Sequence, residues 1–236
     1  DILGKQRAGG AIRSIITCRG PARGYVANFL SLLARVEPDA PYYAFCDQDD
    51  IWDADKLYRA TSCLQTLPED AAALYCSRTR FVDAHGAPSG QSPLFGRAPS
   101  FANALVQNIA GGNTMVFNRA GMKLLKAAGQ VDVASHDWWV YLLLAGAGAQ
   151  IYYDPHPGLS YRQHEHNVIG ANLGPVSRVR RYLEALAGRN RGWNERNLRA
   201  LAATYELLTP ESQRQLQLFR QLRAHTGCCC TRDWNP

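Results

Sequence analysis

The sequence lacks the features that mark membrane-spanning, secreted and disordered proteins. Its longest apolar stretch, residues 140–153, is too short to cross a bilayer and contains several Ala and Gly residues. No signal peptide is visible at its N-terminal end. The composition is neither collagen-like nor typical of a disordered chain, and no internal repeat is present. These absences exclude fibrous, disordered and membrane-spanning classes and indicate a globular protein.

The sequence also lacks a disulfide framework. Four of its seven cysteines are scattered through apolar segments, where we expect small buried side chains: Cys18, Cys46, Cys63 and Cys76. Free thiols indicate a reducing compartment, so we expect a cytoplasmic location. The other three cysteines lie in residues 225–236, which show no folding pattern and are predicted to form a disordered or non-native tail.

What the sequence does contain is enough apolar material for one large α/β domain with a helical appendage. It has 236 residues, of which 46% are hydrophobic. Strands are predicted over residues 11–18, 42–46, 73–77, 113–117, 150–153 and 159–163, and helices over residues 25–36, 54–67, 100–107, 118–128 and 137–145. This alternation predicts a mostly parallel sheet flanked by helices. Residues 174–224 read as helices alone, and they form the appendage.

Three carboxylates follow directly after one of the predicted strands. The apolar residues 42–46 end at Asp47, Asp49 and Asp50. Parallel strands carry ligands beyond their carboxyl ends, and clustered carboxylates suit Mg²⁺ or Mn²⁺. In extended chain, residues two apart point to the same side, so Asp47 and Asp49 can converge on one cation. Capping of the next helix is an alternative that this segment alone leaves equally open.

Two further segments are rich in groups suited to binding or catalysis. Asp137 opens an apolar helix and is followed by two tryptophans, so it is either an N-cap or a general base beside aromatic surface. Residues 161–168 contain Arg, Gln, His, Glu and Asn side chains, a density beyond what a solvated loop needs. A polar loop edge remains the alternative for that segment.

A glycine pair forms the fourth candidate segment. Gly111 and Gly112 precede Asn113 and Thr114, and paired glycines let backbone approach a ligand closely. The segment is not a phosphate loop, because the Lys-Ser/Thr end of that motif is absent. A simple turn is the alternative.

In their order along the chain, these motifs resemble the inverting family 2 glycosyltransferases of GT-A fold, in particular their bacterial rhamnosyltransferase-like branch. The resemblance covers about residues 18–171. Its matching segments are Gly20-Pro21 with residues 28–30, residues 45–52 with residues 55–57, residues 112–118, residues 136–139, and residues 161–164 with Asn167-Val168. The aspartate run and the His-Asp-Trp-Trp segment are specific when they occur together.

The resemblance implies a GT-A, Rossmann-like domain over residues 1–173 that lacks its first strand and helix. The wall that holds the nucleotide base would then precede Asp1. It also implies the catalytic roles. Asp49 would ligate the divalent metal that bridges the donor diphosphate, with His164 near it, and Asp137 would be the catalytic base.

The remaining implied roles concern the donor and acceptor. Asp47 would contact the ribose or the donor sugar. Arg162 and Gln163 would lie close to the leaving group or the acceptor. Asn113 and Thr114 would line the donor-sugar or acceptor pocket.

The resemblance predicts a metal-dependent inverting glycosyltransferase. It would move a rhamnose-like sugar from a nucleotide-diphosphate donor, with dTDP-rhamnose as a candidate, to a cell-envelope polysaccharide or a lipid-linked glycan. The alternatives are a zinc hydrolase built on His164 and His166, and a non-catalytic sugar- or lipid-binding fragment. The net charge of +6 and the arginines of residues 178–199 fit either a solvated helical face or peripheral contact with an anionic membrane. Nucleic-acid binding is not expected, since no aromatic platform accompanies the arginines.

Overall fold

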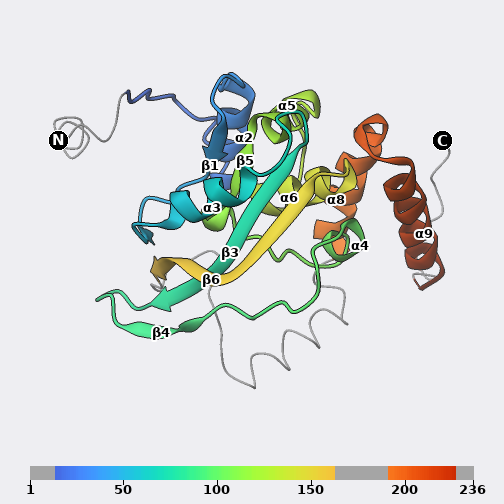
Figure 1. Ribbon diagram of the computed structural model, residues 1–236. Coiled ribbons are helices and arrows are strands. Elements are labelled where there is room, and N and C mark those ends of the chain that lie inside the picture. The colour runs from blue at the N-terminus through green and yellow to red at the C-terminus, as the bar shows by residue number, and fades with distance from the viewer. Residues whose placement is uncertain (1–13, 163–190, 227–236) are drawn as a thin grey trace.

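The structure is a computed structural model, and it describes residues 14–162 and 191–226. In these residues six strands form one sheet with helices on both faces (Figure 1). The strand order is β1 (Tyr42–Ala44), β5 (Val116–Asn118), β3 (Ala73–Val82), β6 (Gln150–Arg162) and β2 (Ile51–Trp52), and β4 (Pro88–Gln91) pairs with β3 outside this path. The expected α/β class is confirmed.

The sheet is mixed, which corrects the expectation of a mostly parallel sheet. The two longest strands, β3 and β6, are parallel, whereas the β1–β5, β5–β3, β3–β4 and β2–β6 pairs are antiparallel. The alternation of apolar residues reports which face of a strand is buried, and it carries no information about the direction of its neighbours. In the part of the chain that the structure describes, β1 pairs on one side only.

The connection between β1 and β2 places the acidic segment across the sheet. These two strands stand at opposite ends of the strand order, and residues 45–50 join them directly. β1 is held by β5 at Ala44, which pairs with Val116. β2 is held by β6, where Ile51 pairs with Ser160. The acidic residues therefore have a fixed strand on each side.

Strand β3 is buried on both faces, which explains its continuous apolar start. Ala73 and Tyr75 pack in one cluster with Ala60 and Leu64 of α3 (Lys56–Leu64). The alternating residues, Leu74 among them, belong to the larger core on the opposite face. A strand covered on both faces needs apolar residues at successive positions.

Helix α6 (His136–Gly146) forms the centre of the larger core. Most of its residues are buried, from Trp138 to Leu144, as expected for a helix that is apolar all round. Around it lie α2 (Tyr25–Arg35), α4 (Phe101–Ala104) and α5 (Arg119–Ala127). The C-terminal helices α8 (Arg191–Ala203) and α9 (Pro210–Thr226) contribute Leu201 and Leu216 to the same core, with the short turn η2 (Tyr205–Leu207) between them.

Several predicted helix starts are confirmed by their caps. The Ser100 hydroxyl accepts a hydrogen bond from the Asn103 amide at 3.1 Å. The Asn118 side chain accepts one from the Gly121 amide at 2.9 Å, and Thr209 accepts one from Ser212 at 3.2 Å. Helix α3, predicted from residue 54, begins after Asp55, and Asp53 pairs with Arg80 at 3.1 Å.

Other predicted elements differ from the structure. Residues 14–18 are not a strand, while residues 11–13 lie outside the described residues. Residues 113–117 were expected as one strand, but a 3-10 turn, η1 (Gly112–Thr114), comes first and β5 begins at Val116. The two strands expected over 150–163 form one strand, β6. Helix α9 reaches Thr226, two residues into the expected tail.

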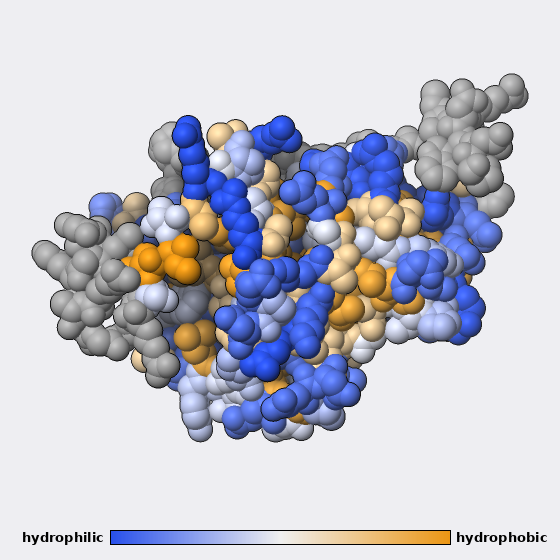
Figure 2. All heavy atoms as spheres, turned by 90° about the horizontal axis from the view of Figure 1, so that it is seen from above, coloured by the Kyte–Doolittle hydropathy of each residue, from blue (hydrophilic) through white to orange (hydrophobic). Residues whose placement is uncertain are grey.

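The cysteines and the surface complete the fold. All four described cysteines are free, but Cys76 alone among them is fully buried, while Cys18 and Cys46 are exposed. Seen from above, the described surface shows several apolar patches separated by polar and charged residues (Figure 2). Among residues 14–162 and 191–226, no helix combines the length and the apolar character needed to span a bilayer.

Candidate active site

The acidic segment between β1 and β2 is partly buried, and one of its carboxylates is clamped. The Asn113 side-chain amide donates a hydrogen bond to Asp50 Oδ2 at 2.5 Å. Burial, with the neighbouring charges of Asp47 and Asp49, raises the pKa of Asp50 to about 6, although the Asn113 bond acts in the opposite direction. Asp50 is thus attached to a segment that lies far away in the sequence.

Asp137 lies in the first turn of α6 and is held by backbone and hydroxyl donors. Its Oδ1 accepts hydrogen bonds from the Trp138 amide at 2.7 Å and from the Ser135 hydroxyl. Its Oδ2 accepts one from the Gly112 amide at 3.2 Å. The positive end of the helix dipole also favours an anion here. Asp137 is therefore a fixed carboxylate. From the described residues, its Oδ2 accepts one hydrogen bond and its Oδ1 accepts two.

The turn η1 joins the two acidic elements. Gly112 donates its amide to Asp137, and the next residue, Asn113, donates its side chain to Asp50. Thr114 is 1% exposed, and its hydroxyl donates to the Gly111 carbonyl at 2.7 Å. A β-carbon at Gly112 would stand 2.8 Å from His136 Nε2, so this close approach requires glycine.

Asp47 lies within electrostatic reach of both Asp49 and Asp137. Burial raises the pKa of Asp47, and the charges of Asp49 and Asp137 raise it further. The structure therefore brings the aspartate run and the Asp137 carboxylate together, as the motifs implied. Their roles in catalysis stay predictions.

His136 fills an aromatic box beside Asp137. Its ring stacks on Phe29 at 4.2 Å between centroids and meets the edge of Phe45 at 5.0 Å and of Tyr25 at 5.9 Å. Both ring nitrogens are buried without a hydrogen-bond partner among the described residues. Burial lowers the pKa of His136, while the charge of Asp137 opposes that shift. The buried imidazole acts here as a packing group.

Two tyrosines face the acidic residues and were not identified as site residues from the sequence. Burial raises the pKa of Tyr25, as do the charges of Asp137 and Asp47. Burial and then the charge of Asp50 raise the pKa of Tyr161 to about 12. Tyr25 starts α2 and Tyr161 lies near the end of β6. The sequence signal was only their place along the chain: Tyr161 opens the matching segment 161–164, and Tyr25 lies just before the segment 28–30.

The end of β6 brings Arg162 to the acidic segment. Its guanidinium donates to the Asp49 carbonyl at 3.4 Å and to the Ala84 carbonyl at 2.8 Å. Gln163, His164 and His166 lie outside the described residues.

The tryptophans after Asp137 belong to the core. Trp138 is 6% exposed and Trp139 is 1% exposed. The Trp138 indole donates to the Ala104 carbonyl at 2.7 Å. The two tryptophans therefore pack in the core and do not form the aromatic surface that the sequence suggested beside Asp137.

The carboxylates of the acidic segment are of the chemical type that binds hard divalent cations. Asp47 and Asp49 supply oxygen donors, and the repulsion that raises the pKa of Asp47 is one that a bound cation would relieve. However, residues 14–162 and 191–226 contain no cluster of three or more His, Cys, Asp or Glu arranged to hold a metal. The expected ligand His164 lies outside those ranges, so the complete ligand set stays a prediction.

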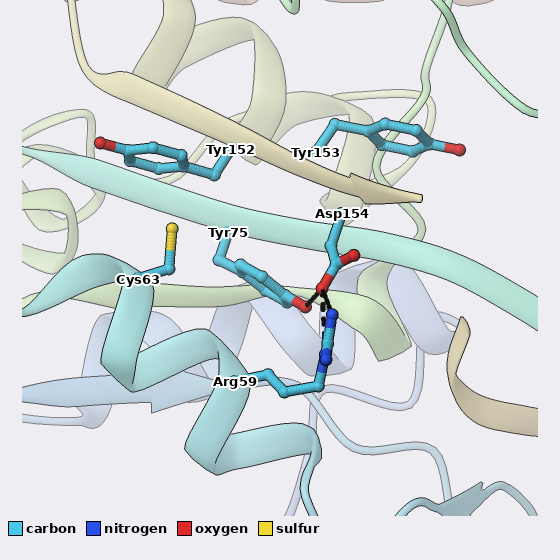
Figure 3. Close-up of a pocket in the computed structure, with 6 residues that line it drawn as sticks. All are labelled: Arg59, Cys63, Tyr75, Tyr152, Tyr153 and Asp154. Atoms are coloured by element: carbon cyan, nitrogen blue, oxygen red, sulfur yellow. Dashed lines mark hydrogen bonds and ion pairs between the residues drawn. The ribbon is translucent and has the colours of Figure 1, made fainter. Parts of the chain in front are cut away.

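A cavity of about 330 Å³ lies between α3 and the strands β3 and β6. The Arg59 guanidinium and the Tyr75 hydroxyl both donate to Asp154 Oδ2 at 2.6 Å (Figure 3). Tyr152 and Tyr153 extend away from this cluster in opposite directions (Figure 3). The polar groups at its centre bind one another, which makes the cluster a structural tie between helix and sheet.

Comparison with known proteins adds one relative. No protein-family model matches the chain. The chain is similar to the dTDP-rhamnosyl transferase RfbG of Shigella flexneri, with 32% identity over 164 residues, which are 65% of this chain and 54% of the relative. The chain thus spans about half the length of that curated protein. The similarity supports a glycosyltransferase, the class that the motifs predict.

Proposed function

We propose that the chain belongs to a metal-dependent inverting glycosyltransferase of family 2 and GT-A fold. The observation that carries this proposal is the turn η1, which binds Asp137 with its backbone and Asp50 with the next side chain. A general base and an acidic, donor-binding segment need a fixed relative position for displacement at a sugar carbon. The motif order and the relative's name support the same class.

In this proposal Asp137 is the general base. The acceptor hydroxyl oxygen attacks the anomeric carbon as its proton passes to Asp137, and the bond to the departing diphosphate breaks on the opposite face, which inverts the centre. Asp137 Oδ2 is the better placed oxygen, since it accepts one hydrogen bond and Oδ1 accepts two. These donors keep the carboxylate oriented.

The acidic segment would bind the donor. Asp49, with His164, would hold Mg²⁺ or Mn²⁺, and Asp47 would contact the ribose or sugar. When bound, the cation offsets charge on the leaving diphosphate. Arg162 and Gln163 would lie near the leaving group or the acceptor. Asn113 and Thr114 would shape the pocket wall, in keeping with the Asn113 bond to Asp50.

The proposed donor carries a rhamnose-like sugar, with dTDP-rhamnose the first candidate because the relative is named a dTDP-rhamnosyl transferase. The acceptor would be a cell-envelope polysaccharide or a lipid-linked glycan. The enzyme would act in the cytoplasm, with peripheral contact to an anionic membrane through its basic C-terminal part. The net charge of +6 supports that contact.

The test uses the full-length protein with dTDP-rhamnose and other nucleotide sugars. Asp137→Asn should reduce transfer by about 10²–10⁴-fold, the usual contribution of a general base, while donor binding is retained. Asp49→Asn should lose transfer together with metal-dependent donor binding. Asp132→Asn is the matched control, because Asp132 pairs with Arg196 on the surface.

Unchanged transfer in Asp137→Asn would contradict the proposal. The zinc hydrolase alternative depends on His164 and His166, and the non-catalytic alternative predicts donor binding without transfer in the wild-type protein. Calorimetry with the nucleotide sugar separates binding from transfer.

A further inference from the structure

Lys56 is a buried lysine that follows the acidic segment after strand β2 and residues 53–55. It is the first residue of α3 and is 2% exposed. Its ammonium nitrogen lies 3.6 Å from the centre of the Trp52 ring. That nitrogen is buried and has no hydrogen-bond partner in the part of the chain that the structure describes.

This position is an unfavourable one for a cation. Burial removes the hydration of the ammonium group, and a helix N-terminus is the positive end of the helix dipole. The neighbouring strand nevertheless leaves room for the side chain. A β-carbon at Gly158 of β6 would stand 3.6 Å from Lys56 Cγ and 3.2 Å from Ser77 Oγ. Burying the charge of Lys56 costs more free energy than burying an apolar side chain of similar length would. The fold nevertheless accommodates it.

The groups around Lys56 include the acidic segment. Asp50 Oδ1 and Trp52 Nε1 are also buried without a hydrogen-bond partner among the described residues. Burial lowers the pKa of Lys56 to about 8, and the nearby Cys46 and Asp50 groups oppose that shift. One short stretch, residues 50–56, therefore contains a buried cation, a half-buried carboxylate and the indole ring on which the cation rests.

We propose that Lys56 is a positioning residue whose buried ammonium is the counter-charge that keeps Asp50 in its bond with Asn113. Through that bond, Lys56 fixes the acidic segment relative to η1 and so relative to Asp137. The cation–π contact with Trp52 keeps the ammonium in place without an oxygen ligand. The inference rests on the proposed function, because its kinetic consequence needs that donor site.

A double-mutant cycle tests the inference on the full-length protein. The variants are Lys56→Met, Asp50→Asn and the two together. If the charges act through each other, each single change lowers kcat/KM for the nucleotide sugar by about tenfold or more, and the double variant loses little more than the worse single one. The donor KM should rise more than kcat falls, because the acidic segment binds the donor.

Two further measurements separate positioning from plain packing. Lys126→Met is the matched control, since Lys126 Nζ pairs with Glu37 at 3.1 Å on the surface, and it should leave the kinetics unchanged. Trp52 fluorescence, taken as the difference from Trp52→Phe, should change in Lys56→Met because the cation leaves the ring.

The same cycle is measured by urea unfolding, which does not depend on activity. Each single change alters the unfolding equilibrium constant by some factor relative to the wild type. The factor for the double variant should differ from the product of the two single factors. Multiplicative effects in this cycle, or unchanged donor kinetics in Lys56→Met, would overturn the inference. If the wild-type protein transfers no sugar, the proposed function fails while the urea cycle still decides the coupling.

Discussion

At the scale of single residues, Gly112 sets the distance between the two halves of the candidate site. Gly112→Ala would place a methyl group 2.8 Å from His136 Nε2 and 3.2 Å from Asp137 Cβ. His136 is enclosed by aromatic rings, so it has little room to move away. We expect a destabilisation of about 1–3 kcal/mol from overpacking, together with a loss of transfer as η1 separates from Asp137.

Urea unfolding and donor kinetics check this prediction. Gly96→Ala is the control, because a β-carbon at Gly96 meets nothing within 4 Å. If Gly112→Ala and Gly96→Ala have the same free energy of unfolding and the same donor kinetics, η1 tolerates displacement.

His136 makes a prediction about pH. Its pKa in the folded protein is lowered by burial from its ordinary value of 6.5. Between the two pKa values the unfolded chain binds more protons, so His136 makes the free energy of unfolding fall as the pH falls below 6.5. The slope from one such group is at most about 1.4 kcal/mol per pH unit.

His136→Phe should remove this contribution. Urea unfolding at pH 7.5 and at pH 5.5 should show a smaller difference for the variant than for the wild type. His85→Gln, at an exposed position in the β3–β4 turn, is the control. An unchanged difference in His136→Phe would show that another group causes the pH dependence.

The residues with a chemical signature could be predicted from the sequence, and those that act by packing could not. Asp47, Asp49, Asp50 and Asp137 could be singled out because they stand in the motif segments that carry the family resemblance. The aromatic box of His136 depends on α2, α6 and Phe45, the residue that follows β1, meeting in space. No local pattern contains that contact.

At the scale of elements, Asn118 ties a strand to a helix. Its Oδ1 accepts from the Gly121 amide at 2.9 Å and from the Ala73 amide at 3.0 Å, and its Nδ2 donates to the Ala71 carbonyl at 2.7 Å. Asn118→Ala leaves three backbone groups without their partner. We expect a loss of about 3 kcal/mol, against about 1 kcal/mol for the single cap lost in Ser100→Ala.

Urea unfolding of the two variants measures the difference directly. A similar loss in both would mean that the Asn118 bonds to residues 71 and 73 contribute little.

Helix caps and helical periodicity predicted elements well, whereas strand direction and turns were harder. Helices starting at Ser100 and Asn118 were predicted, and Ser and Asn side chains are well suited to cap the free backbone amides of a first turn. The turn η1 was read as strand because its Thr and the apolar residues after it favour strands. In the structure these residues form a 3-10 turn that donates hydrogen bonds to Asp137 and Asp50. Both partners come from distant parts of the chain, so the local sequence does not show them.

At the scale of the whole molecule, Gly146 joins the C-terminal helices to the sheet domain. A β-carbon there would stand 2.7 Å from Leu208 Cδ2 and 2.9 Å from Phe101 Cε2, both buried residues. Gly146→Ala should therefore loosen the packing of α8 and α9. Hydrogen exchange should become faster in these helices, with an overall loss of about 1–3 kcal/mol.

Gly192→Ala is the control, since a β-carbon at that position meets nothing within 4 Å. If exchange in α8 and α9 is unchanged by Gly146→Ala, the C-terminal helices are held by contacts other than this one.

The path of residues 45–50 has a consequence for how the chain can vary in length. Seven steps along extended chain cover roughly 23–25 Å, and four strand spacings in a flat sheet amount to about 19 Å. Residues 48–49 form a turn, which shortens this reach, so the segment that carries the aspartates has little slack between Ala44 and Ile51. A deletion within it would pull β2 from β6 or β1 from β5. We therefore expect natural and engineered variants to keep this spacing constant while tolerating length changes in the β3–β4 turn.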